Sequence, residues 1–259
     1  MTPRAFAARR TRDGRTSYSI LAEQIEKAGG DLSVVDLACG DGYLARFLLP
    51  RLGAGGKLFG IDMSEAELEV ARRAVRDPRA SFLLAKAENL PLADQSVDVV
   101  LCHMAFMLMA PLEPVIAEIS RVLKKGGRFA AITGNPNVKP GVNADMQSLV
   151  SGFIAQRYPK IGAIRLGDKR IQSIDGLREL FREERGFRGL LDLGEFELQA
   201  VVDPQGLWDY MKDMYFVAML PLTEKNGLRA ALLEFASSHA GDDGQLRFEI
   251  PMRGFGAQK

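Results

Sequence analysis

The stretch VVDLACGDGYLARFLL, residues 34–49, decides the fold. A short β-branched run precedes a turn that contains Gly40 and Gly42, and apolar residues at helical spacing follow the turn. Such a turn lets a ligand approach the backbone and meet the N-terminus of a helix. With Ala45 the two glycines also satisfy the dinucleotide-binding spacing, and Asp62 lies about twenty residues further on. The stretch therefore predicts a strand, loop and helix that bind a nucleotide with free ribose hydroxyls.

The sequence on both sides of this stretch alternates short β-branched runs with helical patterns up to about residue 133. Alternation of this kind is typical of βαβ units and a parallel sheet. The predicted strands are 33–38, 57–62, 80–85, 97–102 and 127–132, and the predicted helices between them are 43–52, 64–75 and 114–123. Ser64 followed by Glu67 forms a capping box for the second of these helices.

The pattern changes after Thr133, where a connector rich in Gly, Pro and Asn begins. Helices are predicted at 144–157, 174–185, 205–219 and 225–239, with a strand at 194–203 and a closing edge strand at 246–259. We expect a single domain over 1–259. Its parts are an N-terminal arm and helix (1–32), a cofactor-binding core (33–133), a cap insert (134–190), and C-terminal strands with cap helices (191–259).

Composition limits the partners that this chain is expected to have. The chain is 47% apolar and 26% charged with a net charge of +1, so no strong field draws it to nucleic acid or anionic lipid. No apolar run approaches the length of a membrane span, and the first residues lack the apolar segment of a secretory signal. Cys39, Cys102 and two histidines are too few for a disulfide scaffold or a zinc site. We expect a cytoplasmic protein without a metal, and the oligomeric state stays open.

The charge of the loop indicates which nucleotide it binds. A pyrophosphate needs surroundings free of negative side chains, whereas Asp36 ends the strand and Asp41 lies within the turn. S-adenosylmethionine carries an ammonium and a sulfonium group, which carboxylates attract. An NAD-dependent oxidoreductase remains an alternative on the glycine spacing alone.

Four ordered motifs now point to a family. They are Val35–Gly42, Gly60–Ser64, Ala87–Pro91 with Ser96–Val100, and Leu123–Arg128. In these motifs the chain resembles the class I S-adenosylmethionine-dependent methyltransferases, specifically the ubiquinone/menaquinone-methyltransferase-like small-molecule branch. The resemblance implies an α/β fold with a Rossmann-like, seven-stranded, mostly parallel sheet whose last strand is antiparallel. It also implies cofactor and substrate sites at the carboxyl ends of the strands, and we expect a helical cap over them.

The resemblance also implies the cofactor contacts. Asp62 is expected to hold the ribose hydroxyls, Met63 to lie against the adenine, and Gly40 to face the methionine part. The other expected cofactor residues are Tyr18, Asp36, Ala38, Ala87, Glu88 and His103.

Two residues depart from the family pattern. Ala38 replaces the usual first glycine of the motif, which narrows the turn without blocking it. Lys86 stands where many relatives have an Asp that binds the adenine amino group, and a lysine cannot accept that bond. Either the backbone around Ala87 and Glu88 recognises adenine or Lys86 points to solvent.

The acceptor is expected to be a small organic molecule, because the motifs of the adenine, cytosine, arginine and catechol methyltransferases are missing after the fourth strand. His103 follows that strand and is a candidate base or substrate anchor, or else it only shapes the pocket. Tyr215 is a second candidate proton acceptor. The expected substrate-binding residues are His103, Met104, Met107, Trp208, Met211 and Tyr215.

The predicted function is transfer of a methyl group from S-adenosylmethionine to an O or N atom of a small aromatic or heterocyclic metabolite. Biosynthesis of a specialised metabolite or a quinone is the expected setting. The arm 1–20, the insert 135–190 and the helix 205–219 are expected to close over the site. Besides the oxidoreductase, a non-catalytic cofactor-binding partner protein is an alternative.

Overall fold

The computed structural model describes residues 4–26, 30–158 and 167–259, and the side chains at positions 4, 5, 26 and 215 lie outside this description. The chain divides into two compact units. The helical unit comprises Met1–Thr16, Pro136–Arg165 and Phe196–Pro251, and the core unit comprises Ser17–Asn135, Leu166–Glu195 and Met252–Lys259. The predicted cofactor core, 33–133, falls wholly in the core unit, whereas the predicted cap insert, 134–190, is divided between the two units. The single domain stays a prediction.

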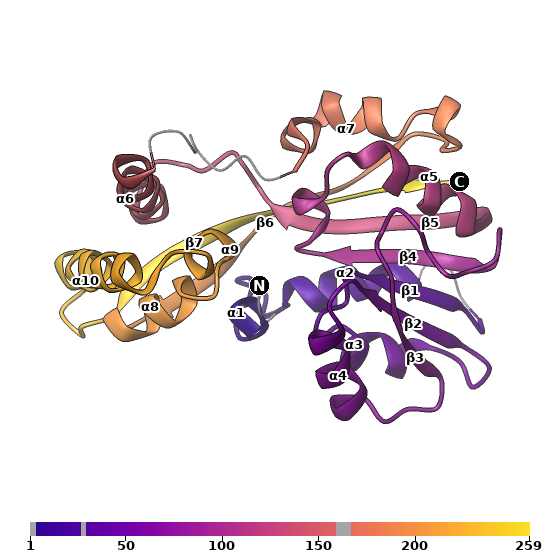
Figure 1. Ribbon diagram of the computed structural model, residues 1–259, viewed down its shortest axis with the longest axis horizontal. Helices are drawn as coiled ribbons and strands as arrows, with labels where there is room; N and C mark the ends of the chain where they lie inside the picture. The colour runs from indigo at the N-terminus through magenta and orange to yellow at the C-terminus, as the bar shows by residue number, and fades with distance from the viewer. Residues whose placement is uncertain (1–3, 27–29, 159–166) are drawn as a thin grey trace. The chain divides into compact units, whose positions relative to one another are not determined.

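Seven strands form one sheet in the order β3-β2-β1-β4-β5-β7-β6. Their bounds are β1 Ser33–Leu37, β2 Lys57–Asp62, β3 Ala80–Leu84, β4 Val97–His103, β5 Leu123–Gly134, β6 Leu190–Val202 and β7 Leu246–Gln258. Neighbours from β3 to β5 are parallel, and β7 runs antiparallel to β5. Figure 1 shows β5, β4, β1, β2 and β3 side by side in that order. The predicted Rossmann-like sheet with an antiparallel last strand is confirmed.

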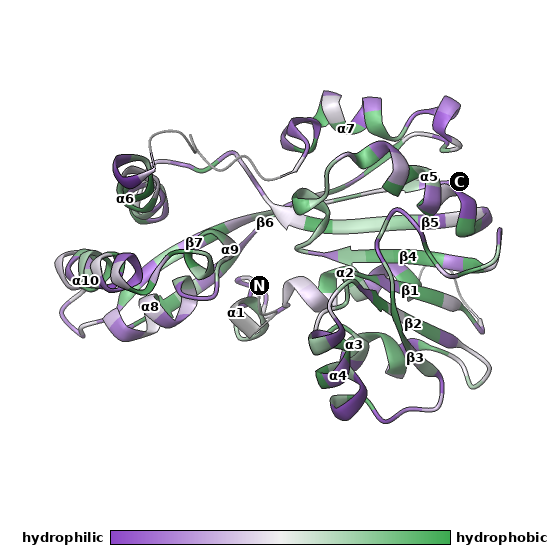
Figure 2. Cartoon of the chain, viewed as in Figure 1, coloured by the Kyte–Doolittle hydropathy of each residue, from purple (hydrophilic) through white to green (hydrophobic). Residues whose placement is uncertain are grey.

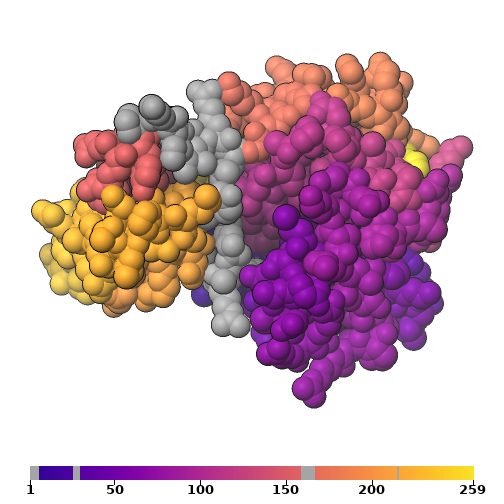
Figure 3. Space-filling view, in the orientation of Figure 1, coloured from indigo at the N-terminus to yellow at the C-terminus, as the bar shows by residue number. Residues whose placement is uncertain are grey.

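The central strands are apolar because both of their faces are covered. β1 and β4 are almost fully buried, and Figure 2 shows both strands as mainly hydrophobic. On one face α2 (Ser17–Glu26) contacts β4 and β5, α3 (Ala45–Leu48) contacts β2, and α4 (Glu65–Ala74) contacts β2 and β3. In the space-filling view of Figure 3, the segments coloured purple to magenta pack into one body.

On the other face, α5 (Leu112–Val122) contacts β5, and α7 (Ile174–Leu180) contacts α5. Four rings with centroids 5.1–6.4 Å apart fill the space between these helices and the sheet, namely Phe106, Phe129, Phe181 and Phe255. Short helical turns complete the unit: η1 Leu49–Arg51, η2 Phe106–Leu108, η3 Lys169–Gln172 and η4 Glu183–Arg185. The expected cap of α4 is present, since Ser64 accepts a hydrogen bond from the Glu67 backbone.

The prediction that the closing strand is an edge strand was wrong. β7 lies between β5 and β6, so β6 forms the edge of the sheet. Alternating burial is confined to the first half of β7, whereas Met252–Ala257 are all buried. Gly256 permits this close pairing, because a Cβ atom there would lie 2.3 Å from the carbonyl oxygen of Phe129. The polar end of the strand misled the prediction.

The helical unit contains α1 (Arg4–Ala7), α6 (Val142–Arg157), α8 (Pro204–Met211), α9 (Tyr215–Ala218), α10 (Leu222–His239) and the residues of β6 and β7 from Phe196 to Pro251. α10 contacts α6 and α8. The predicted continuous helix 205–219 is instead two helices, because Met214 bonds to the carbonyl of Met211 and so closes a tighter turn. Among the described residues, no helix combines the length and apolarity that crossing a bilayer requires.

Candidate functional site

The glycine loop between β1 and α3 is built from left-handed residues. Ala38, Gly40 and Gly42 have φ values of 58°, 53° and 74°. Glycine adopts this conformation freely, whereas an L-residue with a side chain loses roughly 1–2 kcal/mol. A Cβ atom on Gly42 would also lie 3.0 Å from the side chain of Ala71 and 3.2 Å from the ring of Phe82. The loop therefore needs glycine at position 42 and holds Ala38 under strain.

Asp62, at the end of β2, ties this loop to the neighbouring strand. Its Oδ2 accepts a hydrogen bond of 2.9 Å from the Gly40 backbone, and its Oδ1 accepts one of 2.9 Å from the Ser64 backbone. The carboxylate is half-buried. Each oxygen retains a further lone pair, so the group can still accept two hydroxyl donors. This geometry suits the predicted ribose contact.

Asp36 is the most deeply buried carboxyl group at the loop, with 2% of its surface exposed. Burial, together with the charges of Asp62 and Asp41, raises the pKa of Asp36 to about 8. Three carboxyl groups thus surround the glycine loop, and a cationic ligand would relieve their repulsion. A pyrophosphate would increase it.

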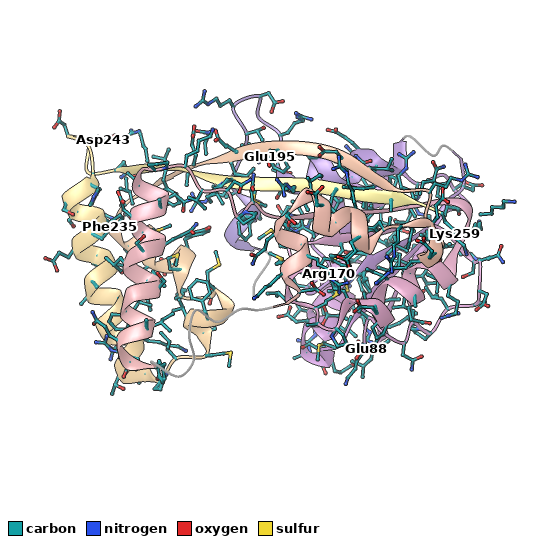
Figure 4. The ribbon with its side chains drawn as sticks, turned by 90° about the horizontal axis from the view of Figure 1, so that it is seen from above. Glu88, Arg170, Glu195, Phe235, Asp243 and Lys259 are labelled. Carbon is teal, nitrogen blue, oxygen red and sulfur yellow. The ribbon has the colours of Figure 1, made fainter. Side chains whose placement is uncertain are left out.

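The expected adenine side of the site lies beyond β2 and β3. Met63 is 71% exposed, which leaves a large apolar side chain free to cover a flat ring. Lys86 is exposed, in line with the expectation that its side chain points to solvent. Glu88, labelled in Figure 4, is exposed as well. In the part of the chain that the structure describes, no hydrogen bond engages the backbone N–H of Ala87 or Glu88. These two donors are open to a ligand.

His103, the last residue of β4, is held by two residues of α2. Its Nε2 lies 2.9 Å from Ser17 Oγ, and its ring stacks on Tyr18 with the centroids 3.8 Å apart. Burial lowers the pKa of His103 to about 3, so the imidazole is neutral at physiological pH. Burial and the charges of Asp41 and Asp36 raise the pKa of Tyr18, which keeps its phenol neutral.

The candidate acceptor residues belong to different units. Met104 and Met107 lie in the core unit directly after β4, and Met104 has a φ of 53°, a strained conformation of the kind that clusters at functional sites. Trp208, half-buried, and Met211, 5% exposed, lie in the helical unit. The side chain of Tyr215 lies outside the described residues. Their meeting around one acceptor stays a prediction.

Sequence reasoning missed a row of buried polar residues at the end of β5. Thr133, Asn135 and Arg253 are 1%, 7% and 9% exposed, and Arg253 pairs with Thr133 across β5 and β7. Arg253 forms an ion pair with Glu195, and its Nη1 has no hydrogen-bond partner among the described residues. Because β7 was predicted to be an edge strand, its polar residues were expected to be exposed, and the burial of Arg253 was not predicted. Ser17 was also missed, although a serine before an aromatic helical stretch is a helix-start signal that could have drawn attention to it.

Among the described residues, no group of three or more His, Cys, Asp and Glu side chains is arranged to hold a metal ion. The arrangement instead offers a glycine loop, a half-buried carboxylate at the end of β2 and two backbone N–H groups that no hydrogen bond engages among the described residues. These features lie along the carboxyl ends of parallel strands, where open α/β sheets bind ligands.

Comparison with known proteins identifies this region. Residues 35–131 match the methyltransferase domain family. Over 103 residues the chain is 37% identical to a demethylmenaquinone methyltransferase of Symbiobacterium thermophilum, covering 38% of this chain and 41% of that protein. Over 164 residues it is 33% identical to a phthiotriol/phenolphthiotriol dimycocerosates methyltransferase of Mycobacterium tuberculosis, covering 61% of this chain and 58% of that protein. The chain thus spans about half the length of the curated relatives it matches.

Solved structures share the fold. A protein of Anaeromyxobacter dehalogenans described as a type II methyltransferase superposes with a TM-score of 0.66 at 21% identity, covering 96% of this chain and 97% of that one. The phosphoethanolamine N-methyltransferase 2 of Haemonchus contortus, in complex with S-adenosylhomocysteine, superposes with a TM-score of 0.55 at 17% identity, covering 93% of this chain and 52% of that one. Residues 35–131 are therefore a methyltransferase domain, and over this stretch the chain is similar to demethylmenaquinone methyltransferases.

Proposed function

We propose that this protein transfers a methyl group from S-adenosylmethionine to an O or N atom of a small aromatic or heterocyclic metabolite, in specialised-metabolite or quinone biosynthesis. The observation that carries the proposal is the ordering of His103 by Ser17 and Tyr18 at the end of β4. A neutral imidazole, fixed in position, lies in the same unit as the glycine loop and its three carboxyl groups.

Different residues around the glycine loop would bind different parts of the cofactor. Asp62 would accept hydrogen bonds from the two ribose hydroxyls while still holding Gly40 and Ser64. Gly40 and the strained Ala38 would face the methionine part, and Asp36 would attract its cationic groups. When bound, S-adenosylmethionine supplies an activated methyl group on a sulfonium ion.

The adenine would be recognised by backbone rather than by Lys86. The open N–H groups of Ala87 and Glu88 can donate to a ring nitrogen, and Met63 offers an apolar surface for the ring. Tyr18 is almost fully buried beside His103, so we assign it to the wall between cofactor and acceptor.

His103 would accept the proton of the acceptor as the methyl group arrives. An imidazole whose conjugate acid has a pKa of about 3 is too weak a base to ionise a phenol in advance. A hydroxyl oxygen that is forming its bond to the methyl group becomes far more acidic, and it can then release its proton to this neutral ring. Ser17 and Tyr18 keep the ring in place for that transfer.

Two features support a small acceptor. The relatives named above are a demethylmenaquinone and a phthiotriol/phenolphthiotriol dimycocerosates methyltransferase, which act on small molecules. Met104 and Met107, next to His103, are polarizable and suit a flat apolar ligand. An NAD-dependent oxidoreductase is disfavoured, because the charges of Asp62 and Asp41 beside the buried Asp36 would repel a pyrophosphate.

The experiment uses S-adenosylmethionine labelled in its methyl group and a panel of hydroquinones, phenols and heteroaromatic amines. We expect labelled product with at least one of them, and hydrolysis or NMR then identifies the methylated atom. Label on a carbon atom would refute the O or N assignment. Binding of S-adenosylmethionine with no transfer to any small aromatic acceptor would favour the non-catalytic partner protein.

A further inference from the structure

We propose that Glu118 and Arg121 of α5 are positioning residues for cofactor recognition, because they clamp the loop 86–92 that presents the adenine-facing backbone. This inference rests on the proposed cofactor contacts of Ala87 and Glu88. It adds a role for a helix that does not itself contribute a predicted site residue.

The clamp consists of hydrogen bonds from one ion pair to the backbone of the loop. Glu118 Oε2 accepts a hydrogen bond of 2.7 Å from the Leu90 backbone N–H. Arg121 donates from Nη2 to the Leu90 carbonyl at 3.0 Å and from Nη1 to the Leu92 carbonyl at 2.8 Å. Three backbone groups of a loop without regular structure are thus held by two side chains.

The two side chains also fix one another. Arg121 donates from Nε to Glu118 Oε1 at 2.7 Å and from Nη2 to Glu118 Oε2 at 2.8 Å, which is a bidentate pair. A further bond of 2.7 Å joins Arg121 Nη1 to Asp94. The Glu118 side chain is 17% exposed and that of Arg121 is 31% exposed, so solvent competes little for the carboxylate. The guanidinium lowers the pKa of Glu118, which stays ionised.

The clamp holds one end of the short segment that contains Ala87 and Glu88, so it can fix the positions of their backbone N–H groups. Leu90 is 3% exposed and belongs to the core, so it anchors one end of the loop. At the other end, Ala85 donates its backbone N–H to the carbonyl of Asp62 at 3.0 Å. Ala87 and Glu88 lie between these two anchors. Releasing the anchor at Leu90 would let their N–H groups drift from the adenine, and a displacement of a fraction of an ångström weakens a hydrogen bond.

A matched control is an ion network that contacts the same helix from η3. Arg170 of η3 bonds to Glu113 in the first turn of α5 at 2.6 Å, and also to Asp168 and Glu179 (Figure 4 labels Arg170). This network resembles the clamp in chemistry, with one arginine and several carboxylates. Among the described residues, no hydrogen bond from Arg170 reaches the loop 86–92. Loss of Arg170 therefore tests for a general effect of breaking an ion network on α5.

The test measures, by calorimetry, the affinity of the full chain for S-adenosylhomocysteine and for S-inosylhomocysteine, in which an oxo group replaces the adenine amino group. In Glu118→Ala we expect about a tenfold loss for S-adenosylhomocysteine, equivalent to ~1.4 kcal/mol. We expect a smaller loss for the inosine analogue, so that the preference for adenine falls. Glu118→Gln keeps an acceptor for Leu90 and should lie between Glu118→Ala and the unchanged protein. Arg170→Ala should retain the affinity for both ligands.

Three results would overturn the inference. If Glu118→Ala and Arg170→Ala weaken both ligands by the same factor, the pair only stabilises the fold and does not position the loop. If Asp62→Ala, measured in parallel, leaves both affinities unchanged, the proposed cofactor site fails and the positioning role fails with it. If Asp62→Ala weakens the binding of both ligands but Glu118→Ala keeps the wild-type preference for adenine, only the clamp is refuted and the proposed cofactor site stands. An unfolding midpoint for each variant confirms that the folded protein was measured.

Discussion

Replacing Asp36 with Asn should change how the stability of the ligand-free protein depends on pH. The pKa of Asp36 is about 8 in the folded chain, against about 3.9 for an unperturbed Asp in the unfolded chain. Between these values the folded state keeps the proton and the unfolded state releases it. The free energy of unfolding therefore falls as the pH rises from about 4 to about 8, by about 1.4 kcal/mol per pH unit from this group alone.

The size of the effect follows from that slope. From pH 5 to pH 8 the wild-type protein should lose up to ~4 kcal/mol through Asp36. Asparagine resembles the protonated acid in shape and carries no proton to release. Asp36→Asn should therefore match the wild type near pH 5 and exceed its stability by up to that amount at pH 8. Urea unfolding of both proteins at four pH values measures this, because the difference between the two curves cancels every other titrating group.

Folding favours the protonated form of Asp36, whereas cofactor binding should favour the ionised form. S-adenosylmethionine is cationic, so it favours the ionised form of Asp36, and binding at pH 7 should release a proton that calorimetry in buffers of different ionisation enthalpy detects. Asp36→Asn should bind the cofactor more weakly without proton release from this site. Parallel stability curves for wild type and Asp36→Asn between pH 5 and 8 would refute the assignment of a raised pKa to Asp36.

Substitutions at three further positions test the site. Ala38→Gly should relieve the left-handed strain at φ 58° and raise the free energy of unfolding by about 1 kcal/mol, whereas a lower stability would show that the turn is relaxed with alanine. Gly42→Ala combines a φ of 74° with a contact of 3.0 Å to Ala71, so thermal unfolding should reveal a loss of at least about 1–2 kcal/mol and an unchanged midpoint would contradict this packing. His103→Ala and His103→Asn should each lower turnover about a hundredfold with cofactor affinity nearly intact, and near-normal turnover of the Asn variant would reduce His103 to an orienting role.

The core unit could be predicted from the sequence because its signals are local. Parallel strands buried on both faces appear as continuous apolar runs, and Ser64 with Glu67 marks the start of α4. The position of β7 could not be predicted, since burial of Met252–Ala257 depends on β5 and β6, which lie far away in the sequence. Its polar ending and its alternating first half resemble an edge strand. Gly256, which allows the close pairing with β5, adds no apolar side chain that would have indicated a buried strand.

The candidate site was predictable to a similar extent. The glycine loop and Asp62 lie within one short stretch, so their meeting follows from the strand order. The contacts of His103 with Ser17 and Tyr18, and the burial of Arg253, arise between distant segments and have no local pattern. The pKa of about 8 for Asp36 likewise depends on its burial and on the charges of Asp62 and Asp41, which come from another strand and a loop. Spacing in the sequence shows that acids are present near the turn but not how deeply each is buried.

The most direct test of the central claim is calorimetric titration of S-adenosylhomocysteine into the wild type and Asp62→Ala, with NAD titrated in parallel. The wild type should bind S-adenosylhomocysteine and not NAD. Asp62→Ala should lose on the order of 2–3 kcal/mol, because it removes a charged acceptor for two ribose hydroxyls. An unchanged affinity for S-adenosylhomocysteine in Asp62→Ala, or tight binding of NAD, would contradict the account.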